Sequence, residues 1–332
     1  MDTNYFKSSK KVLIIRFHRV GDVVLTLPAV RSLKKTYRNL SITMLVDSRT
    51  FNLIEKDDTF DEIIVWDKKR WRNLPKLKAI REIFKALLYL RKKKFDIVLD
   101  FQDFLETAVL SFLTGAKNRI GYSDGLKSMF YNIKVAPIKG VRHDVERYFT
   151  LLRAIDVKCE TDDLKIKFTN EDKKYADEFL KNAGINENDI LIGVNPGASA
   201  SYKMWGVDNF SKLADAILQK DNNPKILVFW GPGEEEIANN LISKLSHKLI
   251  LAPSTSLRQF AALVERCNVF ITNDTGPMHI AAGMSVFVLA IFLKNHSDPR
   301  ISSPLGNKHK VVIAEETTIS DILLFYESVN KC

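Results

Sequence analysis

The sequence predicts an α/β protein with two doubly wound parallel-sheet domains in tandem. Short runs rich in Val, Ile and Leu alternate with longer stretches whose apolar residues recur at three- and four-residue steps. This alternation restarts near residue 171, and the 332 residues of the chain suffice for two domains with separate cores. Strands that alternate with helices of this length indicate a parallel sheet covered on both faces.

In the first half, the apolar run at residues 11–17 predicts a strand, and the stretch that follows it predicts a helix. The expected elements after that strand are a helix at 22–37, strands at 41–46 and 62–67, a helix at 80–94, a strand at 95–102 and a helix at 105–115.

In the second half, residues 207–220 show the clearest helical pattern, with apolar residues at positions i, i+3, i+4, i+7 and i+8. One face of this helix is expected to be buried, and it consists of Phe210, Leu213, Ala214, Ile217 and Leu218. The other expected elements are helices at 171–184, 234–245, 257–267 and 276–284, and strands at 189–197, 225–231, 269–274 and 285–292.

The polar stretch at residues 158–172 is the expected linker, and it divides the chain into domains at 1–165 and 166–332. Open parallel sheets bind ligands at the carboxyl ends of their strands. We therefore expect a ligand-binding cleft between the two domains.

The composition is that of an ordinary globular protein, with 45% hydrophobic and 27% charged residues. No apolar stretch approaches the roughly 20 residues needed to span a bilayer, and the N-terminal region lacks the features of a signal peptide. Cys159, Cys267 and Cys332 are far apart in the sequence and are expected to be reduced thiols. These observations predict a cytoplasmic protein.

The net charge of +10 is concentrated in one segment, because residues 68–94 contain twelve Lys and Arg residues against Glu82 alone. Apolar residues, among them Trp71, Ile80 and Phe84, are interleaved with these charges at helical spacing. Such a basic amphipathic segment suits an anionic membrane surface. Nucleic acid is another possible partner, although no nucleic-acid-binding motif accompanies the charge, and an ordinary helix with a solvated basic face is the third alternative.

The stretch TNDTGPMH at residues 272–279 has the features of a phosphate-binding turn. An apolar strand leads into Asp274, Thr275 and Gly276, and a helix start presents unpaired N–H groups and partial positive charge. His279, one turn into this helix, either donates a hydrogen bond to a phosphate or is a core histidine. A well-capped helix without a ligand would give the same pattern.

Two further stretches in this half begin at the ends of predicted strands. In NPGASASYKMW, small residues precede Lys203, whose flexible charge suits a diphosphate. In WGPGEEE, Glu234 follows a Gly-Pro-Gly turn. A carboxylate there either accepts hydrogen bonds from ribose hydroxyls or merely complements the helix dipole.

In the first half, Gly21-Asp22 stands at the junction of a strand and a helix. Asp22 is either a helix cap or a group that accepts a proton during catalysis. The sequence contains no P-loop or dinucleotide fingerprint at a strand end. It also contains no cluster of potential metal ligands, so we expect no metal site.

Together these stretches resemble the signature blocks of the ADP-heptose–lipopolysaccharide heptosyltransferase family, glycosyltransferase family 9. The similarity runs in order from about residue 11 to the low 300s. The blocks that carry it are LIIRFHRVGDVVLTLPAVRSLKK, FDIVLDFQDFLETAVLSFLTGAKNRIGY, NPGASASYKMWGVDNFSKLA, TSLRQFAALVERCNVFITNDTGPMHIAAG and SDPRISSPLG.

This resemblance implies a GT-B fold, in which two Rossmann-like domains face a central cleft. The implied activity is inverting, metal-independent transfer of heptose from ADP-L-glycero-D-manno-heptose to the inner core of lipopolysaccharide, on a Kdo/heptose–lipid A acceptor, without a cofactor. The acceptor is expected on the N-terminal domain and the nucleotide sugar on the C-terminal one. Such an acceptor would bring the enzyme to the inner face of the cytoplasmic membrane.

The resemblance also assigns roles to individual residues. Asp22 is expected to be the general base, and Lys203 is expected to contact the donor phosphates and support catalysis. The remaining donor contacts are expected at Ser199, Glu234, Thr255, Asp274, Thr275, Gly276 and His279, and the acceptor contacts at His18, Arg19 and Gly21.

Two alternatives remain open from the sequence. The first is a related inverting glycosyltransferase that uses another nucleotide-sugar donor, because the donor turns do not specify the base. The second is a non-catalytic protein that binds anions or nucleic acid through its basic segment.

Overall fold

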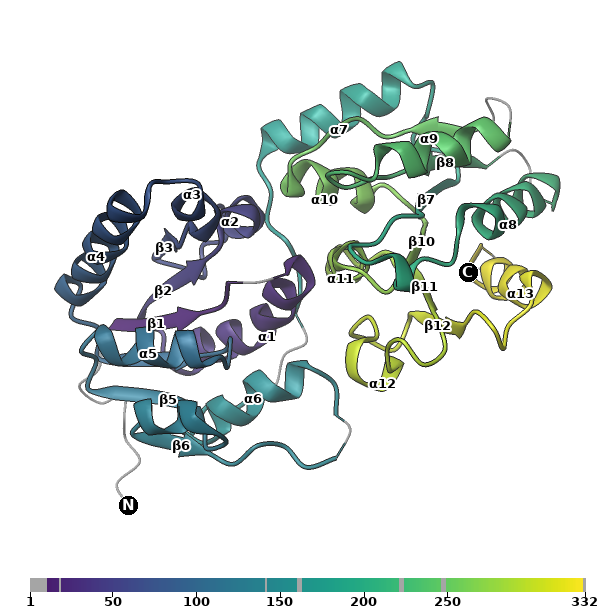
Figure 1. The fold of residues 1–332 in the computed structure, drawn as a ribbon. Helices are drawn as coiled ribbons and strands as arrows, with labels where there is room; N and C mark the ends of the chain where they lie inside the picture. Colours follow the sequence, from purple (N-terminus) through teal and green to yellow (C-terminus); the bar gives the residue numbers. More distant parts are fainter. Residues whose placement is uncertain are drawn as a thin grey trace. The chain divides into compact units, whose positions relative to one another are not determined.

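The computed structural model describes residues 11–17, 19–140, 142–159, 163–220, 224–245 and 249–330. The chain divides into two compact units, of which the first ends at Asp163 and the second begins at Leu164. Each unit contains a six-stranded sheet with helices on both of its faces (Figure 1). The doubly wound α/β class expected from the sequence is confirmed.

In the first unit the strand order is β3-β2-β1-β4-β5-β6, and all neighbouring strands are parallel. The elements of this unit are β1 (Lys11–Ile15), α1 (Val20–Thr36), β2 (Ser41–Val46), α2 (Ser48–Ile54), β3 (Glu62–Val65), α3 (Lys68–Arg72), α4 (Lys76–Lys92), β4 (Ile97–Asp100), α5 (Leu105–Leu113), β5 (Asn118–Tyr122), the 3₁₀ helix η1 (Leu126–Phe130), β6 (Ile133–Val135) and α6 (Val145–Arg153).

The core of the first unit follows from its parallel sheet. Strand β1 is buried over four consecutive residues, as expected for a central strand with helices on both faces. Leu13 and Val98 from neighbouring strands pack with Leu90 of α4 and Leu110 of α5 on one of these faces. None of the helices in the described part of the chain is long and apolar enough to cross a bilayer.

In the second unit the strand order is β12-β11-β10-β7-β8-β9, again with parallel pairing throughout. The elements are α7 (Asn170–Asn182), β7 (Leu191–Asn195), the 3₁₀ helix η2 (Ser201–Lys203), α8 (Val207–Lys220), β8 (Lys225–Val228), α9 (Glu235–Lys244), β9 (Leu249–Leu251), α10 (Leu257–Glu265), β10 (Val269–Asn273), α11 (Gly276–Gly283), β11 (Phe287–Phe292), α12 (Pro299–Ser302), β12 (Lys310–Ile313) and α13 (Ile319–Asn330).

The predicted buried face of residues 207–220 is confirmed in α8. Four of its five residues are buried in the core, where α8, α9 and α13 cover one face of the sheet, and Leu218 packs against that core. The buried four are Phe210, Leu213, Ala214 and Ile217.

The two sheets have the same topology. Each starts at its centre, builds three strands outward to one edge, and then returns to build three strands toward the other edge. The direction therefore reverses between β1 and β4 in the first unit and between β7 and β10 in the second. In open α/β sheets this switch point leaves a crevice at the carboxyl ends of the strands, where ligands bind.

The second switch point is tightly packed at Gly193 in β7. This glycine lies opposite Phe270 of β10, and a Cβ atom added at Gly193 would be 2.5 Å from the Phe270 Cδ2 atom. We expect Gly193→Ala to lower the free energy of unfolding by about 1–3 kcal/mol, because the ring has no room to retreat within a packed core. Urea denaturation measures this loss, and adding Phe270→Leu should restore part of it. Equal stability of Gly193→Ala and the unsubstituted protein would contradict the packing described.

Candidate functional site

At the first switch point, the Asp22 carboxylate is paired with a guanidinium group. Arg16 Nη2 lies 2.5 Å from Asp22 Oδ2, and Arg16 Nη1 donates to the carbonyl oxygen of Phe101 at 2.8 Å. The Asp22 side chain is 24% exposed, whereas that of Arg16 is 10% exposed. The carboxylate is therefore held in a fixed position and remains accessible to solvent.

The helix-cap interpretation of Asp22 needs a correction. Helix α1 begins at Val20, two residues earlier than expected, so Asp22 is its third residue. The N-cap position is occupied by Arg19, which has a φ of 62° and makes no side-chain capping hydrogen bond. Asp22 still complements the positive end of the helix dipole from the first turn.

The three residues expected to contact the acceptor are placed differently from one another. Arg19 is exposed, and Gly21 is buried in the first turn of α1. His18 lies outside the described residues.

Helix α6 brings a second carboxylate near Asp22, which the sequence analysis missed. Asp144 is the N-cap residue of α6, and the ring of Tyr148, one turn later, lies 5.5 Å from the Arg16 guanidinium. Burial raises the pKa of Asp144, and the Asp22 charge raises it further, although Arg147 lowers it. The apolar residues of α6 follow helical spacing, so this helix could have been predicted.

The loop after β4 is fastened to the loop after β1. The Phe17 N–H donates to Gln102 Oε1 at 2.9 Å, and Asp100 Oδ1 accepts the N–H groups of Gln102 and Asp103 at 3.0 and 3.1 Å. The Tyr131 hydroxyl donates to Asp100 Oδ2 at 2.7 Å. The completely buried Asp100 thus fixes the loop that supports Arg16.

At the second switch point, Lys203 and Asp274 form an ion pair. Lys203 Nζ lies 2.5 Å from Asp274 Oδ2, and in this pair the lysine is the more exposed partner, at 22% against 7%. Asp274 directly follows β10 and precedes the N-terminus of α11. The ammonium group is therefore fixed near the positive end of a helix, in an arrangement that favours an anionic ligand.

Asn273 joins the three segments around this ion pair, a role that the sequence analysis did not assign. Its Nδ2 atom donates to the carbonyl oxygens of Pro196 and Gly197 at 2.9 and 3.1 Å. Its Oδ1 atom accepts the Trp205 N–H at 3.0 Å. A single buried amide thus holds the loop after β7, the segment after Lys203 and the end of β10.

Glu234 lies against the same loop. Its Oε2 atom accepts the Gly231 N–H at 3.0 Å. A Cβ atom added at Gly197 would be 2.3 Å from that oxygen, so only glycine permits this approach. The structure therefore places Glu234 beside the loop that Asn273 connects to the Lys203–Asp274 pair.

The other expected donor residues are distributed around this group. Thr275 is the N-cap residue of α11, with its hydroxyl 3.4 Å from that of Thr272, and Gly276 is the first residue of the helix. His279 is buried in the second turn. Ser199 is exposed on the loop after β7, and Thr255 is half-buried on the loop before α10.

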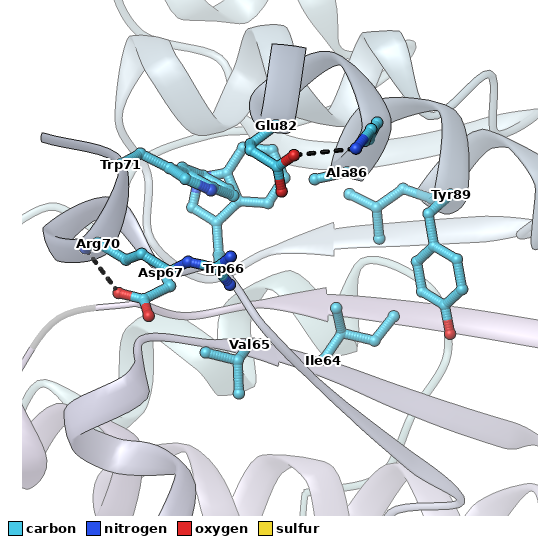
Figure 2. A pocket seen from close by; sticks show the side chains of 11 residues that line it. Ile64, Val65, Trp66, Asp67, Arg70, Trp71, Glu82, Ala86 and Tyr89 are labelled. Carbon is cyan, nitrogen blue, oxygen red and sulfur yellow. Dashed lines mark hydrogen bonds and ion pairs between the residues drawn. The ribbon is translucent and has the colours of Figure 1, made fainter. Parts of the chain in front are cut away.

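The first unit also contains a hollow of about 390 Å³ between β3, α3 and α4 (Figure 2). Trp66 and Trp71 form one wall, with ring centroids 4.7 Å apart. Trp66 also stacks on Phe17, which connects this wall to the loop after β1.

No group of three or more His, Cys, Asp and Glu side chains among the described residues is arranged to hold a metal ion.

A family model for glycosyltransferase family 9 (heptosyltransferase) matches residues 82–322. Because this match covers well over half of the chain, the protein belongs to that family. The family expected from the sequence is confirmed, and the protein is a glycosyltransferase.

Individual relatives are similar over most of their length. Lipopolysaccharide heptosyltransferase 3 of Escherichia coli K12 is 26% identical over 288 residues, which cover 84% of this chain and 80% of that protein. The structure of a family 9 glycosyltransferase from Veillonella parvula DSM 2008 aligns with a TM-score of 0.86 and 25% identity, over 96% of this chain and 97% of that one. The E. coli heptosyltransferase WaaC with ADP-2-deoxy-2-fluoro heptose aligns with a TM-score of 0.74 and 23% identity, over 96% and 99% of the two chains.

Asp100 makes the stability of the first unit depend on pH. Burial raises its pKa from 3.8 to about 6, and the hydrogen bond from Tyr131 opposes that rise. Between pH 4 and 6 the folded protein therefore holds a proton on Asp100 that the unfolded chain has lost. This contribution to stability is present at low pH and disappears as the pH rises toward 6.

We expect Asp100→Asn to remove that contribution, because the amide does not titrate. The two proteins should then differ in how their free energies of unfolding change from pH 4 to pH 7, by about 2–3 kcal/mol. Urea denaturation at each pH measures this difference. Parallel pH profiles for the two proteins would show that Asp100 has an ordinary pKa.

Proposed function

We propose that this glycosyltransferase transfers a heptose from ADP-L-glycero-D-manno-heptose to the inner core of lipopolysaccharide, on a Kdo/heptose–lipid A acceptor. Family membership supports the reaction class. The names of the E. coli relative and of the WaaC complex support a lipopolysaccharide acceptor and an ADP-heptose donor. In this proposal, the first unit binds the acceptor and the second unit binds the nucleotide sugar.

The observation that carries the proposal is the opposite polarity of the two switch-point ion pairs. In the first unit the carboxylate of Asp22 is the more exposed partner, and in the second unit the ammonium of Lys203 is. An accessible carboxylate suits an incoming hydroxyl group, and an accessible cation suits a departing diphosphate. The buried partners, Arg16 and Asp274, hold these groups in position.

The reaction follows from these two charges. Asp22 accepts the proton of an acceptor hydroxyl as the oxygen attacks the anomeric carbon. The bond between that carbon and the diphosphate oxygen breaks, and its electron pair leaves with ADP. Because attack and departure occur on opposite faces in one step, the product has the inverted configuration.

On the donor side, the proposal assigns the growing charge of the diphosphate to Lys203 and the N-terminus of α11. Asp274 positions the lysine, and Glu234 accepts hydrogen bonds from the ribose hydroxyls. The residues proposed for further donor contacts are Ser199, Thr255, Thr275, Gly276 and His279. On the acceptor side they are His18, Arg19 and Gly21.

A lipid-linked acceptor places the enzyme in the cytoplasm, at the inner face of the membrane. The basic segment at residues 68–94 supports this location, since it contains twelve positively charged residues and one negatively charged residue.

The alternative donor, another nucleotide sugar, is distinguished by thermal-shift measurements with ADP, UDP, GDP and CMP derivatives. A selective rise with ADP supports heptose transfer, and a selective rise with UDP favours the alternative.

We expect Asp22→Asn to reduce kcat for heptose transfer by about 10²–10⁴-fold, because the amide has nearly the same shape but accepts no proton. The affinity for ADP, measured by calorimetry, should be unchanged, since Asp22 lies in the other unit. Near-normal turnover in this variant would contradict the assignment of the base.

Lys203→Met should weaken ADP binding about 10–100-fold, because it removes a charge-assisted contact with the diphosphate. The substitution alone strands the buried Asp274, so the informative variant is Lys203→Met with Asp274→Asn. The control is Lys212→Met, on the exposed side of α8. If calorimetry gives the same ADP affinity for the paired variant and the control, Lys203 does not bind the donor.

A further inference from the structure

Helix α4 carries an apolar stripe that the first unit leaves exposed. Leu77, Ile80, Phe84 and Leu88 are 84%, 64%, 59% and 41% exposed. At 100° per residue, their side chains project within an arc of about 80° on one side of the helix. Every residue of α4 is described, and of its 17 residues Leu90 alone is buried.

The stripe is not the side of α4 that packs on the sheet. Ala86 and Leu87 pack against the core. Glu82, Ala86 and Tyr89 line the hollow beneath the helix, opposite Ile64 of β3 (Figure 2). The exposed stripe is therefore additional to the apolar surface that the fold itself uses.

Positive charge borders the stripe. At the same 100° per residue, Lys78, Arg81 and Lys92 follow on the arc beyond the stripe, on the side away from the sheet. All three side chains are exposed. Lys85, by contrast, pairs with Glu82 at 3.0 Å and lines the hollow. The helix thus presents an apolar row and a basic row next to each other.

The neighbouring elements also have exposed apolar side chains. Helix α5 lies beside α4, where Arg91 Nη1 donates to the Leu113 carbonyl oxygen at 3.4 Å. It also contacts η1 through the rings of Phe112 and Phe130, 6.0 Å apart. The exposed apolar residues of these two elements include Leu105, Phe112, Leu126 and Met129.

The geometry points to α4 as an interfacial helix that lies in the surface of an anionic lipid bilayer, with Leu77, Ile80 and Phe84 inserted below the lipid headgroups. Lys78, Arg81 and Lys92 then contact the headgroup phosphates. A helix with an apolar row beside a basic row binds in this way. The inference deepens the proposed function, on which it rests for the identity of the membrane, whereas binding to lipid itself requires no transfer reaction.

Charge is the reason to name lipid as the occupant. Lys68, Lys85 and Lys93 already pair with carboxylates of the first unit. A protein partner would still have to offset the exposed basic row of α4 and also cover a narrow row of aliphatic and Phe side chains. An anionic bilayer meets both demands with one surface, because its phosphates lie directly above its acyl chains.

The test compares vesicles of phosphatidylglycerol and phosphatidylcholine with vesicles of phosphatidylcholine alone, by co-flotation of the full-length protein. The key variant combines Leu77→Ser, Ile80→Ser and Phe84→Ser, which alters exposed side chains only. We expect it to bind the anionic vesicles at least about tenfold more weakly than the unsubstituted protein. The matched control is Leu324→Ser on α13, whose side chain is 61% exposed, and this control should bind normally.

Three results would overturn the inference. The serine variant could bind like the unsubstituted protein, which would make the contact purely electrostatic. The unsubstituted protein could bind neutral and anionic vesicles equally. It could also fail to bind vesicles while the serine substitutions convert a dimer to a monomer in light scattering, which would assign the stripe to a second copy of the chain.

A soluble acceptor separates this inference from the proposed function. Transfer to an inner-core oligosaccharide without acyl chains should proceed at the same rate in the serine variant and the unsubstituted protein. Absence of transfer in both proteins would refute the proposed function and leave the vesicle result standing. Normal transfer with unchanged vesicle binding would refute the interfacial helix alone.

Discussion

The site depends on how two neighbouring loops are held where the strand order reverses. At each switch point the loops leave the sheet in opposite directions, so side chains must satisfy the backbone between them. Arg16 and Gln102 do this in the first unit through Phe101 and Phe17. Asn273 does it in the second unit through the carbonyl oxygens of Pro196 and Gly197. These contacts fix the ends of the strands before any ligand binds.

Each set of contacts also positions a charge. Arg16 reaches both a carbonyl oxygen and Asp22, and Asn273 directly precedes Asp274, the partner of Lys203. In each pair the counter-charge is the more buried partner, so the group left accessible differs in sign between the two units. A fixed, accessible charge reorganises little when charge develops during the reaction, which is how preorganised sites lower barriers.

The central strands and α8 could be predicted because continuous apolar runs and regular helical spacing can be recognised in one sequence alone. Strands β5, β6, β9 and β12 were missed; they are three to five residues long, which leaves few residues in which a pattern can be recognised. The start of α1 was wrong by two residues, because Arg19 takes a φ that local sequence does not reveal. Residue types identified Asp22, Lys203 and Glu234 as candidate site residues. They did not identify the partners that position these residues, since those partners are distant in sequence or depend on burial.

The basic segment illustrates the same limit. Its charge was evident from composition, yet helical spacing alone could not separate an apolar row that faces the core from one that faces outward. The two rows are distinct in the structure, because Leu87 packs on the core while Leu77 and Phe84 are exposed.

The most direct measurement is the product formed from ADP-heptose and an inner-core acceptor, followed by mass spectrometry and by NMR of the new anomeric centre. Single displacement should give one added heptose per acceptor, with its anomeric configuration inverted relative to the donor and one ADP released per transfer. A product with the donor's configuration, or release of ADP and free heptose without a new glycosidic bond, would contradict single displacement by an acceptor activated at Asp22.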